Sequence, residues 1–262
     1  MPGRGRAYAA WRRVLEAAGI MGGRTVLRRA ANPLLRRLGL RLDALPGRRR
    51  TPPHVLVQHR VDLLFDVGAN EGQFAALARQ HGFTGRIVSF EPLPEAHACL
   101  LRNARGDAKW TVHDRVALGA AAGEARINVS ANSVSSSILP MLDAHAAAAP
   151  QSRYVGSAAT PVLPLDAVYD RYRGPGQRAF LKIDTQGFES AVLEGAERSL
   201  ESLVGVQVEL SLAPLYEGQD LYRHFLDFFD SRGFVLWDVC PVFRDGRTGR
   251  LLQVDAVFMR PD

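Results

Sequence analysis

The sequence predicts an α/β fold in which helices cover both faces of a mostly parallel sheet, the doubly wound arrangement. From residue 54 onward, short apolar runs of strand length alternate with longer segments of helical period. The last two apolar runs, 235–240 and 253–259, are separated by a Gly-containing segment with no helical pattern. These two runs are expected to form a hairpin, so that one of them runs antiparallel to the sheet.

The expected elements follow from this alternation in chain order. We expect strands at 62–67, 86–90, 110–118, 179–184, 204–210, 235–240 and 253–259, with a small extra strand at 125–130. Helices are expected between them at 72–81, 94–104, 189–202 and 221–232. Residues 130–160 are rich in Ser and Ala, show no strong period, and are too long for a plain connection.

An Arg-rich segment precedes this pattern. Residues 1–50 hold 13 of the 33 basic residues and two of the 27 acidic ones, so their net charge is +11. The rest of the chain holds 20 basic and 25 acidic residues, so its net charge is −5. Helical patterns at 7–20 and 24–40 and a linker composition at 46–53 divide the chain into an extension, 1–53, and an α/β domain, 54–262. Residues 1–50 could bind an anionic membrane surface, pack on the domain or mediate self-association.

The composition limits the class of protein. A hydrophobic content of 47% and a charged content of 23% are typical of soluble globular proteins, and no uncharged apolar stretch reaches 18 residues. Cys99 and Cys240 have no metal-like spacing and the N-terminus does not resemble a signal peptide, so we expect a cytoplasmic protein, with the inner face of the membrane as the alternative. The acidic balance of the domain argues against a nucleic-acid groove.

The segment FDVGANEGQF, 65–74, is the first candidate ligand site. Asp66 lies near the end of an apolar strand, and Gly68 and Gly72 follow before a helical pattern begins. Ligands of open parallel sheets bind beyond the carboxyl ends of the strands, where these glycines would let backbone approach a ligand. Glu91 ends the next strand, where an acid can accept both ribose hydroxyls of a nucleoside. Asn70 or Glu71 could cap the following helix.

The type of nucleoside follows from the charges in this turn. The run GANEG lacks the second glycine of the dinucleotide fingerprint, and Glu71 would repel a pyrophosphate. Asp66 and Glu71 instead suit the ammonium and sulfonium cations of S-adenosylmethionine, which we therefore expect as the cofactor. The alternative is that Asp66 caps nearby backbone amides of the turn.

Six segments together resemble one family. FDVGANEGQFA, SFEPLPEA, VALGAAAGEA, SVSSSIL, LKIDTQGFESAVLEGA and VQVEL follow one another as in the FkbM-type methyltransferases, and the resemblance covers about residues 55–260. It implies a class I methyltransferase (Rossmann-like) fold whose seven-stranded sheet ends in an antiparallel strand. It also implies methyl transfer, typically to a hydroxyl oxygen of a sugar or polyketide-like scaffold. The matching positions imply that the methionine end is held by Asp66, Gly68, Asn70 and Gly72, the ribose by Glu91, and that Val116 and Ala117 lie at the adenine wall.

The segment LKIDTQGFE, 181–189, is the candidate for the chemistry. Methyl transfer from a sulfonium needs in-line alignment and removal of the hydroxyl proton. Asp184 is the first candidate for this base, or it could bind Mg²⁺ together with Glu209, since Mg²⁺ prefers oxygen ligands. Alternatively, Asp184 is a structural acid of the turn and Glu209 only faces the substrate. Many relatives carry an acid where this chain has Gln186, which weakens the argument for a metal.

A second candidate base is His145, in the loop expected to cover the substrate. The sequence thus predicts an enzyme that transfers a methyl group from S-adenosylmethionine to a hydroxyl of a sugar, a glycan or glycolipid, or a secondary metabolite. N-methylation of a small molecule or peptide and a non-catalytic nucleotide-binding scaffold remain as alternatives. The acceptor itself is not readable, because acceptor pockets of this fold are built from variable loops.

Overall fold

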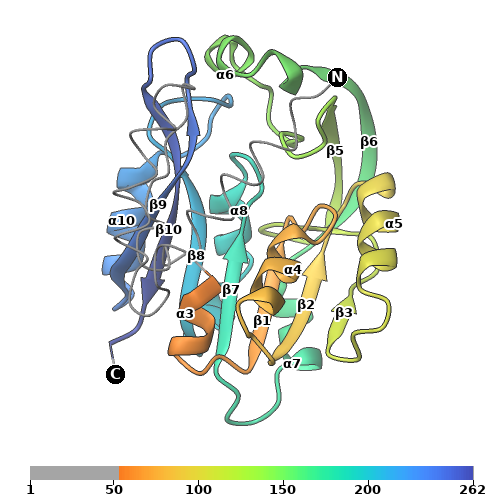
Figure 1. The fold of residues 1–262 in the computed structure, drawn as a ribbon, viewed down its shortest axis with the longest axis vertical. Helices are drawn as coiled ribbons and strands as arrows, with labels where there is room; N and C mark the ends of the chain where they lie inside the picture. Colours follow the sequence, from red (N-terminus) through yellow and green to blue (C-terminus); the bar gives the residue numbers. More distant parts are fainter. Residues whose placement is uncertain (1–52, 262) are drawn as a thin grey trace, which may run out of the picture. The chain divides into compact units, whose positions relative to one another are not determined.

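The computed structural model describes residues 53–261 (Figure 1). The chain divides into two units, Met1–Arg50 and Thr51–Asp262, and the described residues belong to the second. Three expectations fall outside the described residues: the helices at 7–20 and 24–40, the membrane contact of residues 1–50, and the linker at 46–53 except for its last residue. These expectations, and the boundary after residue 53, therefore remain predictions.

A seven-stranded sheet forms the centre of the described domain. Its strand order is β3-β2-β1-β7-β8-β10-β9. The strands are β1 (Leu63–Val67), β2 (Arg86–Phe90), β3 (Trp110–Val112), β7 (Ala179–Ile183), β8 (Leu203–Ser211), β9 (Val235–Arg244) and β10 (Leu251–Met259). The first five are parallel, whereas β10 runs antiparallel to both β8 and β9. The predicted C-terminal hairpin and the predicted class of sheet are confirmed.

Helices cover both faces of this sheet, as predicted. Successive residues of β1 alternate between the faces: Leu63 and Phe65 belong to one apolar cluster and Leu64 to another. The Leu64 face packs against α3 (Pro53–Gln58) and α4 (Gln73–Gln80). The opposite face packs against α8 (Glu189–Glu194), α9 (Glu197–Leu200) and α10 (Tyr222–Asp230). The remaining helices are α5 (Pro94–Asn103), α6 (Asp143–Ala148), α7 (Tyr169–Tyr172) and two 3-10 turns, Pro150–Ser152 and Leu165–Ala167.

A second, three-stranded sheet was only partly expected. It has the order β4-β6-β5 and consists of β4 (Ala117–Leu118), β5 (Gly123–Ser130) and β6 (Tyr154–Leu163). The expected strand at 125–130 is β5, but β6 lies across the end of the segment for which no period was found. Ile127 of β5 packs on Leu93 and Ala96 at the start of α5, which places this sheet beside the carboxyl end of β2.

Two predicted elements are each divided in the structure. The single strand expected at 110–118 is wrong: Trp110–Val112 pairs with β2, whereas Ala117–Leu118 pairs with β6 in the small sheet. The helix expected at 189–202 is interrupted at Gly195, where a Cβ atom would collide with the backbone carbonyl of Gly119. Within residues 53–261, no helix is both long and apolar enough to cross a bilayer.

Candidate active site

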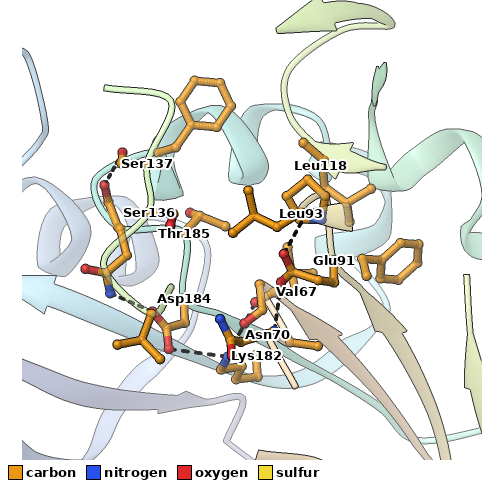
Figure 2. Close-up of a pocket in the computed structure, with 18 of the residues that line it drawn as sticks. Val67, Asn70, Glu91, Leu93, Leu118, Ser136, Ser137, Lys182, Asp184 and Thr185 are labelled. Atoms are coloured by element: carbon orange, nitrogen blue, oxygen red, sulfur yellow. Dashed lines mark hydrogen bonds and ion pairs between the residues drawn. The ribbon is translucent and has the colours of Figure 1, made fainter. Parts of the chain in front are cut away.

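A cavity of about 390 Å³ lies at the carboxyl ends of β1, β2 and β7. Five segments contribute most of its lining residues: 67–70, 90–93, 116–118, 133–138 and 182–188. Figure 2 shows side chains from all five segments around this space. The predicted position of the ligand site, at the edge where the parallel strands end, is therefore the position of this cavity.

The glycine turn is shaped by its packing within the protein. Gly68 has φ = 70°, and a Cβ atom there would collide with the backbone carbonyl of Asp184. Gly72 has φ = 91°, and a Cβ atom there would crowd Trp110 and Leu100. Gly68 lines the cavity, but Gly72 does not. Backbone conformation and close packing therefore require glycine at both positions, and the approach of a ligand to Gly68 stays a prediction.

The next two positions differ from each other. Asn70 lines the cavity, and its side-chain amide donates to Ser133 Oγ at 3.2 Å. Glu71 is exposed and is not among the lining residues, so its expected contact with a cofactor cation finds no support in its position. Neither residue caps α4, whose N-cap is Gly72, because Asn70 Oδ1 instead accepts from Glu71 N at 2.9 Å and Gln73 Nε2 at 3.1 Å.

Glu91 marks one end of the cavity. Its Oε2 accepts from Asn70 N at 2.7 Å and its Oε1 accepts from Leu93 N at 2.8 Å (Figure 2). Burial raises the pKa of Glu91 to about 7, although both backbone hydrogen bonds oppose this shift. Val116 and Ala117 line the cavity as predicted for an adenine wall, together with Leu118. An acid that can accept ribose hydroxyls and an apolar wall thus belong to the same cavity.

Asp66 is completely buried and does not itself line the cavity. Its Oδ2 accepts from Ser89 Oγ at 3.3 Å, and its Oδ1 lies 3.4 Å from Lys182 Nζ. Burial raises the pKa of Asp66, and the charge of Lys182 opposes that shift. The predicted direct contact of Asp66 with the methionine end gains no support from this position, because Asp66 is buried beside Lys182, its neighbour on β7.

Asp184 lines the cavity with its side chain 35% exposed. Its Oδ2 lies 3.5 Å from Lys182 Nζ, and its Oδ1 accepts from Gln186 Nε2 at 2.9 Å. The same Gln186 nitrogen donates to Glu209 Oε2 at 2.6 Å, and Gln186 Oε1 accepts from Tyr216 at 2.8 Å. Asp184 is thus a positioned carboxylate that remains accessible from the cavity (Figure 2).

The expected Mg²⁺ site at Asp184 and Glu209 gains no support. Gln186 Nε2 donates to both Asp184 and Glu209. The amide therefore takes the place between the two carboxylates that a shared Mg²⁺ ion would need. Glu209 does not line the cavity, and its Oε2 accepts a further hydrogen bond from Gln253 at 2.7 Å. Among residues 53–261, no three His, Cys, Asp or Glu side chains are placed to share an ion.

His145 lies away from the cavity. It is buried in α6, and its ring centroid is 5.2 Å from that of Tyr216 and 5.3 Å from that of Phe243. Burial lowers the pKa of His145 to about 4. The prediction that His145 acts as a base finds no support in this position, because the imidazole is buried against Tyr216 and Phe243 and does not line the cavity.

Three cavity residues were missed as candidates. Gln207 and Asp255 line the cavity from β8 and β10, and Lys182 lines it from β7. Gln207 Oε1 is buried and has no hydrogen-bond partner in the described part of the chain. Burial raises the pKa of Asp255 to about 6. The sequence pattern that could have indicated these residues is a polar side chain within an otherwise apolar strand, because a buried polar group needs a partner.

The comparison with protein families agrees with this geometry. The sequence profile described as the methyltransferase FkbM domain matches residues 66–236, well over half of the chain. The chain belongs to the FkbM methyltransferase family. This FkbM protein is accordingly an S-adenosylmethionine-dependent methyltransferase, and the resemblance inferred from the six sequence segments is confirmed.

Solved structures similar to the FkbM protein are remote in sequence. A proposed O-methyltransferase from Klebsiella pneumoniae has 10% identity and a TM-score of 0.47, covering 97% of each chain. An rRNA methylase from Streptococcus thermophilus has 12% identity and a TM-score of 0.45, covering 84% of this chain and 100% of its own. Fibrillarin from Aeropyrum pernix, with bound S-adenosyl-L-methionine, has 12% identity and a TM-score of 0.41, covering 75% and 66%. No curated protein matches the chain.

The cavity residues fit the cofactor that the family uses. S-adenosylmethionine combines an apolar purine, a ribose and a charged amino-acid end. Val116 and Leu118 offer an apolar wall for the purine, and Glu91 offers a carboxylate for the ribose. Charged and polar groups for the remaining end or for an acceptor come from Lys182, Asp184 and Gln207, whose Oε1 has no hydrogen-bond partner among residues 53–261.

Proposed function

We propose that the FkbM protein transfers the methyl group of S-adenosylmethionine to a hydroxyl oxygen of a sugar, a glycan or glycolipid, or a secondary metabolite. The observation that carries this proposal is the carboxylate of Asp184, which lines the cofactor cavity and is held by Gln186 and Lys182. A hydroxyl nucleophile must lose its proton during methyl transfer, so a fixed carboxylate beside the cofactor is the group that the reaction requires.

The chain's own residues have two tasks in this reaction. When bound, S-adenosylmethionine supplies a methyl group already activated by the sulfonium. Glu91 and the apolar wall fix the nucleoside end, and so limit the directions in which the methyl group can point. Asp184 then accepts the hydroxyl proton while the new C–O bond forms and the C–S bond breaks. The proton leaves the acceptor oxygen, and the carboxylate carries it until it exchanges with water.

The polar groups beside Asp184 support a hydroxyl-bearing acceptor. Asp255 and Gln207 line the same cavity, and Gln207 Oε1 lacks a hydrogen-bond donor among the described residues. Carboxylate and amide oxygens accept hydrogen bonds, so they favour a ligand that brings donors, as a polyhydroxylated molecule does.

The test is methyl transfer from isotope-labelled S-adenosylmethionine to fractionated extracts containing glycans, polar lipids and secondary metabolites. The expected product carries the label on oxygen, as an ether that fragmentation in a mass spectrometer locates. A label on nitrogen would instead support the N-methyltransferase alternative. Binding of S-adenosylhomocysteine without transfer to any fraction would favour a scaffold, and both of these outcomes contradict the proposal.

A further inference from the structure

A row of buried polar side chains crosses the main sheet beside the cavity. Ser89 on β2, Asp66 on β1, Lys182 on β7 and Gln207 on β8 are neighbours in the strand register, and each is more than nine-tenths buried. Two positions earlier on the same face, β2, β1 and β7 carry Ile87, Leu64 and Phe180, which belong to an apolar core cluster. The polar row therefore begins where the core ends and the cavity opens.

Lys182 is the member of this row that carries a positive charge. Among the described residues that line the cavity, no other has a basic side chain. Its Nζ lies 3.2 Å from Gly68 O and 3.5 Å from Val67 O, the backbone of the glycine turn. Together with the carboxylates of Asp66 and Asp184, at 3.4 and 3.5 Å, it has four neighbours at long distances. A charge-assisted hydrogen bond to a carboxylate is usually shorter, about 2.7–2.9 Å.

The charge of Lys182 is maintained by its surroundings. Burial lowers the pKa of Lys182, but the charges of Asp184, Asp66 and Asp255 outweigh burial and leave the pKa raised. The cavity thus contains a permanent cation. A cation beside the positive sulfonium of the cofactor is unfavourable unless an anionic group lies between them. Asp184 of the protein is one such group, and the cofactor itself brings another, the carboxylate of its amino-acid end.

We propose that Lys182 binds the carboxylate of the amino-acid end of S-adenosylmethionine, and that Asp66 is a positioning residue that holds Lys182. The inference rests on the part of the proposed function that names S-adenosylmethionine as the cofactor, and it does not depend on the acceptor. Glu91 and the apolar wall occupy one part of the cavity, and the glycine turn leads from there to Lys182 Nζ. A cofactor whose ribose lies at Glu91 and whose tail follows this turn brings its carboxylate to the ammonium.

The test compares two ligands that differ in the carboxylate alone. Calorimetric titration measures the binding of S-adenosylhomocysteine and of its decarboxylated analogue, S-adenosyl-3-thiopropylamine. The wild-type protein is expected to bind the analogue about 10- to 100-fold more weakly, the effect of one charged hydrogen bond. The Lys182→Met variant is expected to bind both ligands with the same affinity, close to that of the wild type for the analogue.

Two further variants separate ligand binding from structure. Lys109→Met makes the same change at the chain's other lysine, an exposed residue that does not line the cavity, and should retain the wild-type ratio of affinities. The double variant Asp66→Asn/Lys182→Met removes both charges of the buried pair, so it can fold even if Lys182→Met alone leaves Asp66 unpaired. This double variant should also bind both ligands equally.

Each outcome has one meaning. A double variant that still discriminates between the two ligands as the wild type does would overturn the role of Lys182, and so would a wild-type protein that binds both ligands equally. Failure of the wild-type protein to bind S-adenosylhomocysteine at all would overturn the cofactor assignment itself, and the inference with it.

Discussion

Glu91 and Asp66 come from neighbouring strands but have different surroundings. Glu91 lines the cavity and is held by two backbone amides, so its contacts leave the carboxylate without a direct cationic partner among the described side chains. Asp66, one strand away, is fully buried and contacts Lys182 and Ser89. The two acids look equivalent in sequence, because each lies at the end of a parallel strand. Their positions differ, because Glu91 lines the cavity whereas Asp66 is buried in contact with a lysine.

This contrast extends to the two ends of the cavity. At the Glu91 end, backbone groups and apolar side chains dominate, so recognition there depends on shape and on one carboxylate. At the Lys182 end, Asp184, Gln186 and Glu209 form a network in which each charge has a partner. We expect variants at the first end to change cofactor affinity. At the second end, we expect Lys182→Met to change cofactor affinity and variants of Asp184, Gln186 and Glu209 to change chemistry or stability.

The largest effect is expected for Asp184→Asn. Loss of a general base should lower the rate of methyl transfer by about 10²–10⁴-fold, whereas the affinity for S-adenosylhomocysteine should change little. Single-turnover kinetics with the acceptor identified by labelling, together with calorimetry, measures both quantities. Asp230→Asn, the same change at an exposed residue of α10, serves as the control. An unchanged rate in Asp184→Asn would remove this carboxylate from the chemistry.

The next effect is expected for Glu91→Ala. Because the carboxylate accepts from two amides and is placed to accept from the ribose, its loss should weaken S-adenosylhomocysteine binding by about 10- to 100-fold. Acceptor binding should be much less affected. Glu95→Ala, at an exposed position nearby in α5, should bind like the wild type. Equal affinities of Glu91→Ala and the wild type would contradict the ribose role.

A smaller effect, on stability, is expected for Gln186→Met. The substitution keeps the length of the side chain but removes the amide that bridges Asp184 and Glu209, so it should lower the free energy of unfolding by about 1–3 kcal/mol. Gln80→Met, at an exposed position of α4, is the matched control for denaturant unfolding. If both variants unfold at the same denaturant concentration as the wild type, the bridge contributes nothing to stability.

The smallest effect concerns pH. Burial raises the pKa of Glu91 to about 7, so the carboxylate is ionised above this pH and increasingly protonated below it. Since a protonated carboxyl loses acceptor capacity, affinity for S-adenosylhomocysteine should fall as the pH is lowered from 8 to 6, by up to about tenfold.

The comparison with Glu91→Gln isolates this titration. Burial also raises the pKa of Glu189 to about 7 and that of Asp255 to about 6, so both groups titrate in the same range. Their contribution to the pH dependence should remain in Glu91→Gln, whereas that of Glu91 should disappear. A pH profile that is identical in the variant and the wild type would show that Glu91 does not cause the dependence.

The sequence predicted the frame of the fold because its strands are strongly patterned. LLFDV and RIVSF are apolar runs followed by turn residues, and the structure places them in adjacent parallel strands. The strand Tyr154–Leu163 was not predicted, because its small and polar residues show no alternation, and its pairing with β5 depends on the tertiary structure. The sequence of residues 113–116 also did not indicate that the chain leaves the main sheet after Val112, so a single strand was predicted at 110–118.

The site was predicted in part for a related reason. The rule that parallel strands present their carboxyl ends to the ligand predicted the positions of Glu91 and Asp184. The family resemblance predicted those of Asn70, Val116 and Ala117, and all five residues line the cavity. Side-chain direction does not follow from that rule. The sequence could not show that Asp66 is buried in contact with Lys182, that Glu71 is exposed, or that Gln186 bridges two carboxylates.

Calorimetric titration with S-adenosylhomocysteine, with and without EDTA, tests the central claim most directly, namely that the Glu91 and Lys182 ends together form a cofactor site that needs no metal. The account predicts one binding event per chain with the same affinity in both conditions. Absence of binding would contradict the cofactor site, and binding that EDTA abolishes would show that a metal ion, and not the Gln186 amide, belongs between Asp184 and Glu209.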